Sequence, residues 1–292
     1  MRINTNTAAM NTYSQLTSSN ASKSSSLAKL SSGLRINKAG DDAAGLAISE
    51  KMKHQISGMT QASRNAQDGI SLIQTAEGGL TETHSILNRM RDLAVQAKND
   101  TNTDEDRGAI QKEMNSLTSE IDRIANQTEF NGKSLLTAKD TNGVATAADT
   151  KFTFQIGANK GQDITLDIKN MTAKSLGIDS AAVGVAAVPL DVSKVGITAG
   201  DFDTVIGTID TAISKVSTER ANLGATQNRL DHTVSNLATT KENLSEANSR
   251  ITDVDMAEEM MSFTKSNILS QASTAMLAQA NQMPQGVLQL LQ

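Results

Sequence analysis

A long row of apolar residues, spaced alternately four and three positions apart, constrains the fold of this chain more than any other feature. Twelve of its fifteen positions are apolar. A period of about 3.5 residues held this long is the signature of a coiled-coil seam, and at about 1.5 Å per residue it predicts a helix about 75 Å long. The positions are Ile48, Met52, Gln55, Met59, Ala62, Ala66, Gly69, Ile73, Ala76, Leu80, Thr83, Leu87, Met90, Ala94 and Ala97.

Three further stretches carry the same periodicity. One follows a capping box formed by Thr103 and Asp106, and another begins after Asp201 or Asp203, either of which can cap it. The first has Ile110, Met114, Leu117, Ile121 and Ile124, and the second has apolar residues at nine of thirteen steps from Ile209 to Ile251. The third runs through Val254, Ala257, Met261, Ile268, Ala272, Ala275, the polar Gln279 and Met283. Each stretch predicts a helix with one face against a neighbour.

The helical pattern stops in the middle of the chain. Asn131-Gly132 is a turn signal, and "KFTFQI" and "DITLDI" alternate apolar and polar residues on either side of "GANKGQ", as a β-hairpin does. The remainder, to about residue 200, is expected to be irregular or weakly stranded. The predicted fold is mainly α: a long antiparallel helical coiled-coil rod formed by both chain ends, with a short β-hairpin-containing central segment.

Composition excludes several classes of partner. With 2% aromatic residues and a net charge of -5, the chain lacks both the large side chains of a compact core and the basic stripe that binds nucleic acid. It has no Cys, which fits either redox compartment. The N-terminus lacks the apolar run of a cleaved signal, and the longest apolar run, 181–190, is too short for membrane insertion.

The candidate chemical sites have simpler interpretations. Asp41-Asp42 lacks the further oxygen ligands of a calcium loop, so we expect the pair to cap a helix, beside a bend or tight contact at Gly40 and Gly45. "NGKS" at 131–134 lacks the upstream glycine of a phosphate loop, and the three histidines form no zinc motif. Glu258 and Glu259 point about 100° apart on a helix. We expect no catalytic residue, no metal and no cofactor.

The two chain ends have too few large apolar residues to be stable as an isolated helix pair. Leu16, Leu27, Leu30 and Leu34 are sparse, and each fully buried Leu contributes only roughly 1.5–3 kcal/mol against the entropy of ordering the helix. We therefore expect these ends to become ordered by packing against identical neighbours in an open helical polymer. The Met-rich C-terminal set, Met256, Met260, Met261, Met276 and Met283, packs in the core or forms an adaptable surface for a chaperone and then a neighbouring subunit.

The chain resembles bacterial flagellin up to about residue 136 and from about 205 to the end. The match rests on blocks such as "INTNTAAMNTYSQL", "LAKLSSGLRINKAGDDAAGLAISEKM", "NRMRDLAVQA", "LGATQNRLDHTVSNL" and "QASTAMLAQANQMPQGVLQLL". The resemblance implies an extracellular subunit of the flagellar filament, exported unfolded by the flagellar type III apparatus without a cleaved signal peptide. It implies as partners an export chaperone and the cap and hook–filament junction proteins.

The resemblance also implies domain boundaries and a receptor site. Inner-tube terminal helices fall at 1–44 and 252–292, a helical rod domain at 45–138 and 202–251, and a variable segment exposed on the outer surface at 139–201. Arg89, Leu93 and Glu113 match the segment that an animal Toll-like receptor recognises in many flagellins. The residues alone allow an alternative interpretation without a receptor. In it, Leu93 packs beside the seam and Arg89 forms an ion pair with Asp92.

Two other functions were weighed against a filament subunit. One is a non-polymerising coiled-coil junction or secreted tip protein, which electron microscopy would reveal by the absence of long tubes. The other is an enzyme carried in the central segment, which has no His and no Cys between residues 139 and 201.

Overall fold

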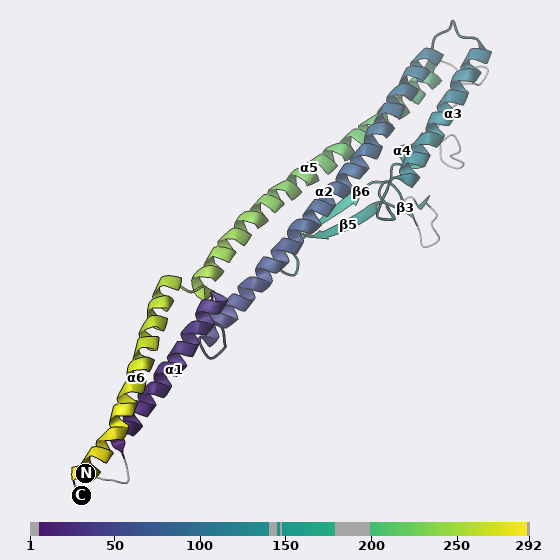
Figure 1. Cartoon of the computed structure of the whole chain (residues 1–292). Coiled ribbons are helices and arrows are strands. Elements are labelled where there is room, and N and C mark those ends of the chain that lie inside the picture. The colour runs from purple at the N-terminus through teal and green to yellow at the C-terminus, as the bar shows by residue number, and fades with distance from the viewer. Residues whose placement is uncertain (1–5, 140–144, 147, 179–198, 291–292) are drawn as a thin grey trace. The chain divides into compact units, whose positions relative to one another are not determined.

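The computed structural model of the chain describes residues 6–139, 145–146, 148–178 and 199–290 (Figure 1). The long helices are α1 (Thr7–Ser32), α2 (Ala43–Ala97), α3 (Asp104–Gln127), α5 (Ala199–Thr252) and α6 (Met256–Leu290), and α4 (Ala173–Leu176) is a single turn. The strands are β1 (Glu129–Phe130), β2 (Lys133–Ser134), β3 (Ala138–Lys139), β4 (Ala145–Thr146), β5 (Thr150–Gln155) and β6 (Asp163–Ile168). The predicted fold class, mainly α with a short hairpin-containing centre, is confirmed.

The chain divides into two compact units. The first unit comprises Met1–Ser57 with Thr240–Gln292, and the second comprises Gly58–Thr239. The second unit holds most of the apolar core, in which α2, α3 and α5 pack together with one face of the β5–β6 hairpin. Its largest fully buried side chains are Ile73, Leu80, Leu87, Met90, Leu93, Met114, Ile121, Leu135, Leu136, Ile168, Ile178 and Ile209.

The seam predicted along α2 is confirmed from Met59 to Ala97, where every predicted position is buried. At the start of the helix the prediction is wrong by one residue. Ile48 is 48% exposed, whereas its neighbour Ser49 is fully buried. The physical reason is that this part of α2 lies in the first unit, where small residues rather than large ones face the neighbouring helices.

Helix α3 begins at the predicted capping box. The Thr103 hydroxyl accepts a hydrogen bond from the Asp106 amide, and the Asp106 carboxylate accepts one from the Thr103 amide at 3.0 Å. The same Thr103 hydroxyl and amide lower the pKa of Asp106 by stabilising its charged form. The predicted face of α3 is confirmed, since Ile110, Met114 and Ile121 are buried.

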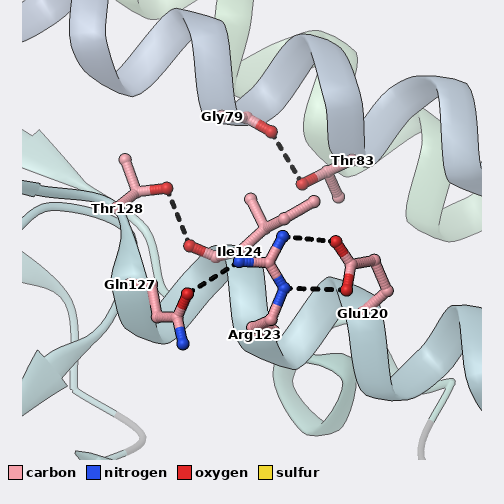
Figure 2. A network of polar contacts seen from close by, with 7 residues as sticks. All are labelled: Gly79, Thr83, Glu120, Arg123, Ile124, Gln127 and Thr128. Carbon is pink, nitrogen blue, oxygen red and sulfur yellow. Dashed lines mark hydrogen bonds and ion pairs between the residues drawn. The ribbon is translucent and has the colours of Figure 1, made fainter.

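The C-terminal end of α3 packs closely on α2 (Figure 2). The Thr128 hydroxyl donates to the Ile124 carbonyl at 2.7 Å and so closes the last turn of the helix. On the outer side, Arg123 donates to both oxygens of Glu120 and to Gln127. Hydrogen bonding by Arg123 lowers the pKa of Glu120.

Two antiparallel hairpins agree with the sequence pattern. Asn131 and Gly132 both have positive φ and form the turn between β1 and β2, as the Asn-Gly signal predicts. In the β5–β6 hairpin, Phe152 faces Leu166 and Phe154 faces Ile164. The hairpin approaches α2 at two glycines, because a Cβ at Gly58 would lie 2.8 Å from the Ala158 Cβ and one at Gly69 would touch Phe154.

The segment after β6 is more ordered than predicted up to residue 178. Its turn of helix, α4, is capped by Thr172 and joined to α3 by a hydrogen bond from the Ala173 amide to Asp122 at 2.8 Å. Lys215 of α5 donates to the carbonyls of Ser175 and Leu176. Residues 179–198, also expected to be irregular, lie outside the described residues.

The predicted cap of the helix after residue 200 is wrong. Helix α5 begins at Ala199, so Asp201 and Asp203 lie inside its first turns. Asp203 instead pairs with Lys98, the residue that follows α2, and the antiparallel pairs Arg91–Asp210 and Arg220–Glu77 continue the register between α2 and α5.

Candidate interaction surface on the terminal helices

Helices α1 and α6 form an antiparallel pair whose most deeply buried residues are small. Ser19 and Ser26 of α1 and Ser266, Ser273 and Ala280 of α6 are buried, and each set repeats every seven positions. Cα atoms of the two helices come within 8 Å of each other. The distance between packed helices depends on the side chains at the contact, and serines allow the two backbones to approach at these positions.

Polar side chains fix the register of this pair. Lys23 donates to Asn267 at 2.9 Å, Ser270 donates to Asn20 at 2.8 Å, and Asn6 donates to the Ala280 carbonyl at 2.8 Å. The three bonds join residues in antiparallel order along both helices (Figure 1). Because hydrogen bonds are directional, they select one alignment that an apolar seam of equal-sized residues would leave open.

Many of the large apolar side chains of the pair lie away from this contact, whereas Leu16, Leu30, Phe263 and Leu277 are half-buried along it. On α6, Met261 is 68% exposed, Met276 61% and Ile268 59%. We call the exposed apolar side chains of the two helices the outer face. Its members are Met10, Tyr13, Leu27, Met256, Met260, Met261, Ile268, Leu269 and Met276. The concentration of exposed apolar side chains on α1 and α6 points to these helices as a place where another molecule binds.

The positions of the periodicity predicted along α6 do not contact α1. Ala257, Met261, Ile268, Ala272, Ala275 and Gln279 are all exposed, whereas the contact with α1 is made by the opposite side of the helix. Core packing of the methionines is therefore wrong for Met256, Met260, Met261 and Met276. The side chain of Met283 lies outside the described residues.

Sequence reasoning missed the contribution of α1 to the outer face. Met10 and Tyr13 are each 63% exposed. The spacing of the two residues was a usable signal, since positions three apart share a helix face and neither falls in the heptad register of Ser19 and Ser26. At about 100° per residue, Leu27 lies about 40° around the helix from Tyr13 and about 100° from Met10.

The helix breaks of the first unit are held together by backbone hydrogen bonds. Gly33 ends α1 in the left-handed conformation at φ 71°, and its carbonyl accepts from the Val254 amide at 3.1 Å. The Arg35 amide donates to the Thr252 carbonyl at 2.6 Å. Leu34 and Asp253 thus form an antiparallel bridge between the α1–α2 loop and the α5–α6 junction.

The two aspartates before α2 have different roles. Asp42 accepts from the Gly45 amide at 2.8 Å and caps the helix, as predicted. Asp41 instead accepts from the amides of Asn37 and Lys38, both at 3.0 Å, and these bonds lower the pKa of the Asp41 carboxyl. Gly45 is a tight contact, because a Cβ there would lie 2.4 Å from the Asp42 carboxylate, whereas a Cβ at Gly40 would meet nothing within 4 Å.

Neither a metal site nor a membrane span is present in the described part of the chain. No three His, Asp or Glu side chains of residues 6–139, 145–146, 148–178 and 199–290 gather in a way that could hold an ion. Over the same ranges, no helix combines the length and the apolar character needed to cross a bilayer.

The three residues matched to receptor recognition are brought together on α2 and α3. Arg89 donates through Nε at 3.0 Å and Nη2 at 2.8 Å to the same oxygen of Glu113, and both side chains are about half exposed. Leu93 is only 2% exposed, so it packs into the core, as the alternative interpretation held. The alternative pairing of Arg89 with Asp92 is wrong, because Arg89 reaches across to α3.

Comparisons with known proteins agree with the helical termini. The family model for the bacterial flagellin N-terminal helical region matches residues 3–141, and the model for the C-terminal helical region matches residues 206–291. The chain is 57% identical to a flagellin of Bacillus subtilis and 51% identical to a flagellin of Halalkalibacterium halodurans, over all of both chains in each case.

A solved structure shares the fold. A flagellar hook-associated protein of Vibrio parahaemolyticus is similar with a TM-score of 0.58 at 19% identity, covering 73% of this chain and all of that one. A likeness at this identity shows the fold alone and does not favour a junction protein over a filament subunit.

Proposed function

Since the chain belongs to the bacterial flagellin family, we infer that the outer face of α1 and α6 is the surface through which it polymerises. The chain is a structural subunit that self-assembles into the helical, extracellular flagellar filament. The observation that carries the assignment of the surface is the distribution of side chains on the α1–α6 pair. The most deeply buried positions of the inner contact are serines and Ala280, whereas Met261, Ile268 and Met276 stand exposed.

The energetics favour a second copy of the chain as the occupant of the outer face. Fully burying an exposed Met, Leu or Ile contributes roughly 1.5–3 kcal/mol, so the eight such side chains of the outer face form a large driving force once a neighbour covers them. A contact that repeats by rotation and rise, rather than by a two-fold axis, produces an open filament instead of a closed dimer.

A charge on the outer face tests this assignment. We expect Ile268→Asp to leave the monomer's helix content by circular dichroism unchanged and to prevent elongation of filament seeds in light scattering and electron microscopy. Thr153→Asp, which adds the same charge on the exposed face of β5, is the control and should elongate seeds normally. Equal critical concentrations for the two variants would contradict the assignment of the outer face.

The family membership supports finer assignments as proposals. We propose that residues 1–44 and 252–292 line the inner tube, that 45–138 and 202–251 form the rod domain, and that 139–201 is the variable segment on the outer surface. The chain is proposed to leave the cell through the flagellar type III apparatus and to meet cap and junction proteins. We propose no catalytic activity.

The exposed methionines of α6 support an export chaperone as a second partner. A thioether side chain is flexible and polarisable, so one methionine-rich surface adapts to two different partners in succession. Ile268→Asp should weaken both contacts if the chaperone and the neighbouring subunit share the outer face.

A receptor contact on the second unit is a separate proposal, carried by the Arg89–Glu113 pair. The pair presents one cationic and one anionic group about half exposed on adjacent helices, whereas Leu93 is positioned to support the surface from below. We expect Arg89→Ala to reduce signalling by the animal Toll-like receptor about tenfold in a reporter cell assay. The control is Arg123→Ala, which removes an exposed Arg from α3, away from the Arg89–Glu113 pair. It should leave signalling unchanged.

A further inference from the structure

Nine of the ten methionines whose side chains the structure describes fall into two groups by exposure, and the tenth, Met52, is intermediate. Met10, Met256, Met260, Met261 and Met276 are 50–68% exposed, and all five lie on α1 and α6. Four others lie in the second unit and are at most 6% exposed, namely Met59, Met90, Met114 and Met171. Exposed and buried thioethers are therefore separated between the two units of one chain.

The rest of the sequence offers few other targets for an oxidant. The chain contains no Cys and no Trp, and its single Tyr is Tyr13. Thiols are oxidised ahead of most side chains, so their absence leaves the methionine thioethers as the main site of two-electron oxidation. Reactivity among the methionines follows exposure, which selects the five on the outer face.

The chemistry is balanced with hydrogen peroxide as the oxidant. A lone pair of the methionine sulfur attacks one peroxide oxygen, the O–O bond breaks, and the departing oxygen takes up a proton to leave as water. The sulfur is oxidised by two electrons to the sulfoxide and the peroxide is reduced. The product is a polar, chiral side chain in place of a flexible apolar one.

We propose that the exposed methionines of α1 and α6 are a peroxide-sensitive modification site whose oxidation in the free subunit prevents its addition to a filament. The proposal rests on the proposed function, in which a second copy of the chain covers the outer face. A sulfoxide keeps its oxygen hydrated, so covering it removes water from a polar group with no partner provided for it.

The same geometry makes the modification depend on the assembly state. The thioethers are open to the solvent in the free subunit, and a neighbouring copy seated on the outer face excludes the oxidant. Oxidation therefore acts before assembly. Once a subunit has joined the filament, its methionines become as protected as the buried four.

The test uses the full-length chain and hydrogen peroxide. Monomers and preformed filaments are treated under the same conditions, sulfoxides are located by peptide mass spectrometry, and the elongation of seeds is then measured. We expect the five exposed methionines to oxidise at least about tenfold faster than the buried four in monomers, and about tenfold slower in filaments than in monomers. The critical concentration of oxidised monomers should rise at least about tenfold.

Two further measurements separate this site from general damage. Methionine sulfoxide reductases of both epimer specificities should restore elongation to the oxidised monomers. A variant with Leu at Met10, Met256, Met260, Met261 and Met276 should show the same critical concentration with and without peroxide. A variant with Leu at Met59, Met90, Met114 and Met171 should keep the peroxide effect. Each variant is compared with its own untreated sample.

The outcomes distinguish the two levels of the proposal. If untreated chain grows filaments and oxidised chain grows them equally well, or reductase does not restore growth, the modification site is wrong and the proposed function stands. If the untreated chain grows no filaments, the proposed function falls and the modification site falls with it.

Discussion

At the scale of single residues, adjacent glycines on α2 occupy different surroundings. A Cβ at Gly79 would lie 2.9 Å from the Thr128 hydroxyl and 3.0 Å from a Leu136 methyl, whereas a Cβ at Gly78 would meet nothing within 4 Å. Gly79 therefore allows the end of α3 to approach α2, as Figure 2 shows. Gly78 has no such role in packing.

The two glycines give a matched prediction. Gly78→Ala should raise the free energy of unfolding by up to about 1 kcal/mol, because Ala loses less backbone entropy in a helix. Gly79→Ala should lower it, because Thr128 or Leu136 must move to admit the methyl group. Urea titration followed by circular dichroism measures both changes. A stabilised Gly79→Ala protein would contradict the close approach.

The Asp41 carboxylate makes the first unit sensitive to acid. Its pKa is lowered in the folded chain by the Asn37 and Lys38 amides. A lowered folded-state pKa stabilises the fold above the unfolded pKa of about 3.9, and this stabilisation is lost as the pH falls through the folded value. Asp41→Asn should therefore weaken the dependence of the urea midpoint on pH below about 4.5. If Asp41→Asn left the pH dependence of the urea midpoint unchanged in acid, the two amide hydrogen bonds would not stabilise the carboxylate.

At the scale of elements, periodicity predicted the second unit well and the first unit poorly. The seam of α2 from Met59 onward, the α3 face and the hairpin strands could be found because large apolar residues there pack within the same chain. On α6 the same kind of pattern falls on a face that α1 does not cover. Spacing alone does not tell whether a face meets the same molecule or another.

Contacts set by small or charged residues were also beyond the sequence pattern. Ser266 and Ser273 carry no apolar signal, yet they form the inner contact of α6. Arg89 had a partner available within its own helix at Asp92, but only the packing of α3 on α2 reveals the stronger contact with Glu113. In both cases the distance between the two helices decides which side chains come into contact.

The serine contact leads to a prediction for the α1–α6 pair. Ser273→Leu should force the two helices apart, because a close-packed contact accommodates added methylenes only by moving the backbone, at a cost of about 1–3 kcal/mol. Spin labels on α1 and α6 should report a longer distance between the two helices. Thermal unfolding should show a lower melting temperature for the pair. Gln271→Leu places the same side chain on an exposed position and should change neither.

At the scale of the whole molecule, apolar burial is distributed unequally. Among the described residues of the first unit, only Ile36 and Ala280 are buried and hydrophobic, whereas the second unit holds all the other such side chains. Since burial of apolar surface is the dominant favourable term in folding, the first unit of a free subunit has the smaller margin of stability.

Hydrogen exchange measures this difference. Amides of α1 and α6 in the free subunit should exchange at least about a hundredfold faster than those of α2 between Met59 and Ala97, and should become protected on assembly. Equal protection in the free subunit would mean that the serine contact alone is sufficient to hold the pair.

The hydrogen bond from Asn6 to the Ala280 carbonyl spans 274 positions of the chain. A ribosome adding about 5–20 residues per second releases the beginning of α1 roughly a quarter of a minute to a minute before it makes the matching turn of α6. For that whole interval the first helix has no partner within its own chain. Contacts between such distant positions also form slowly, so the two ends of the polypeptide close on each other last, after α2, α3 and the hairpin have already found their places.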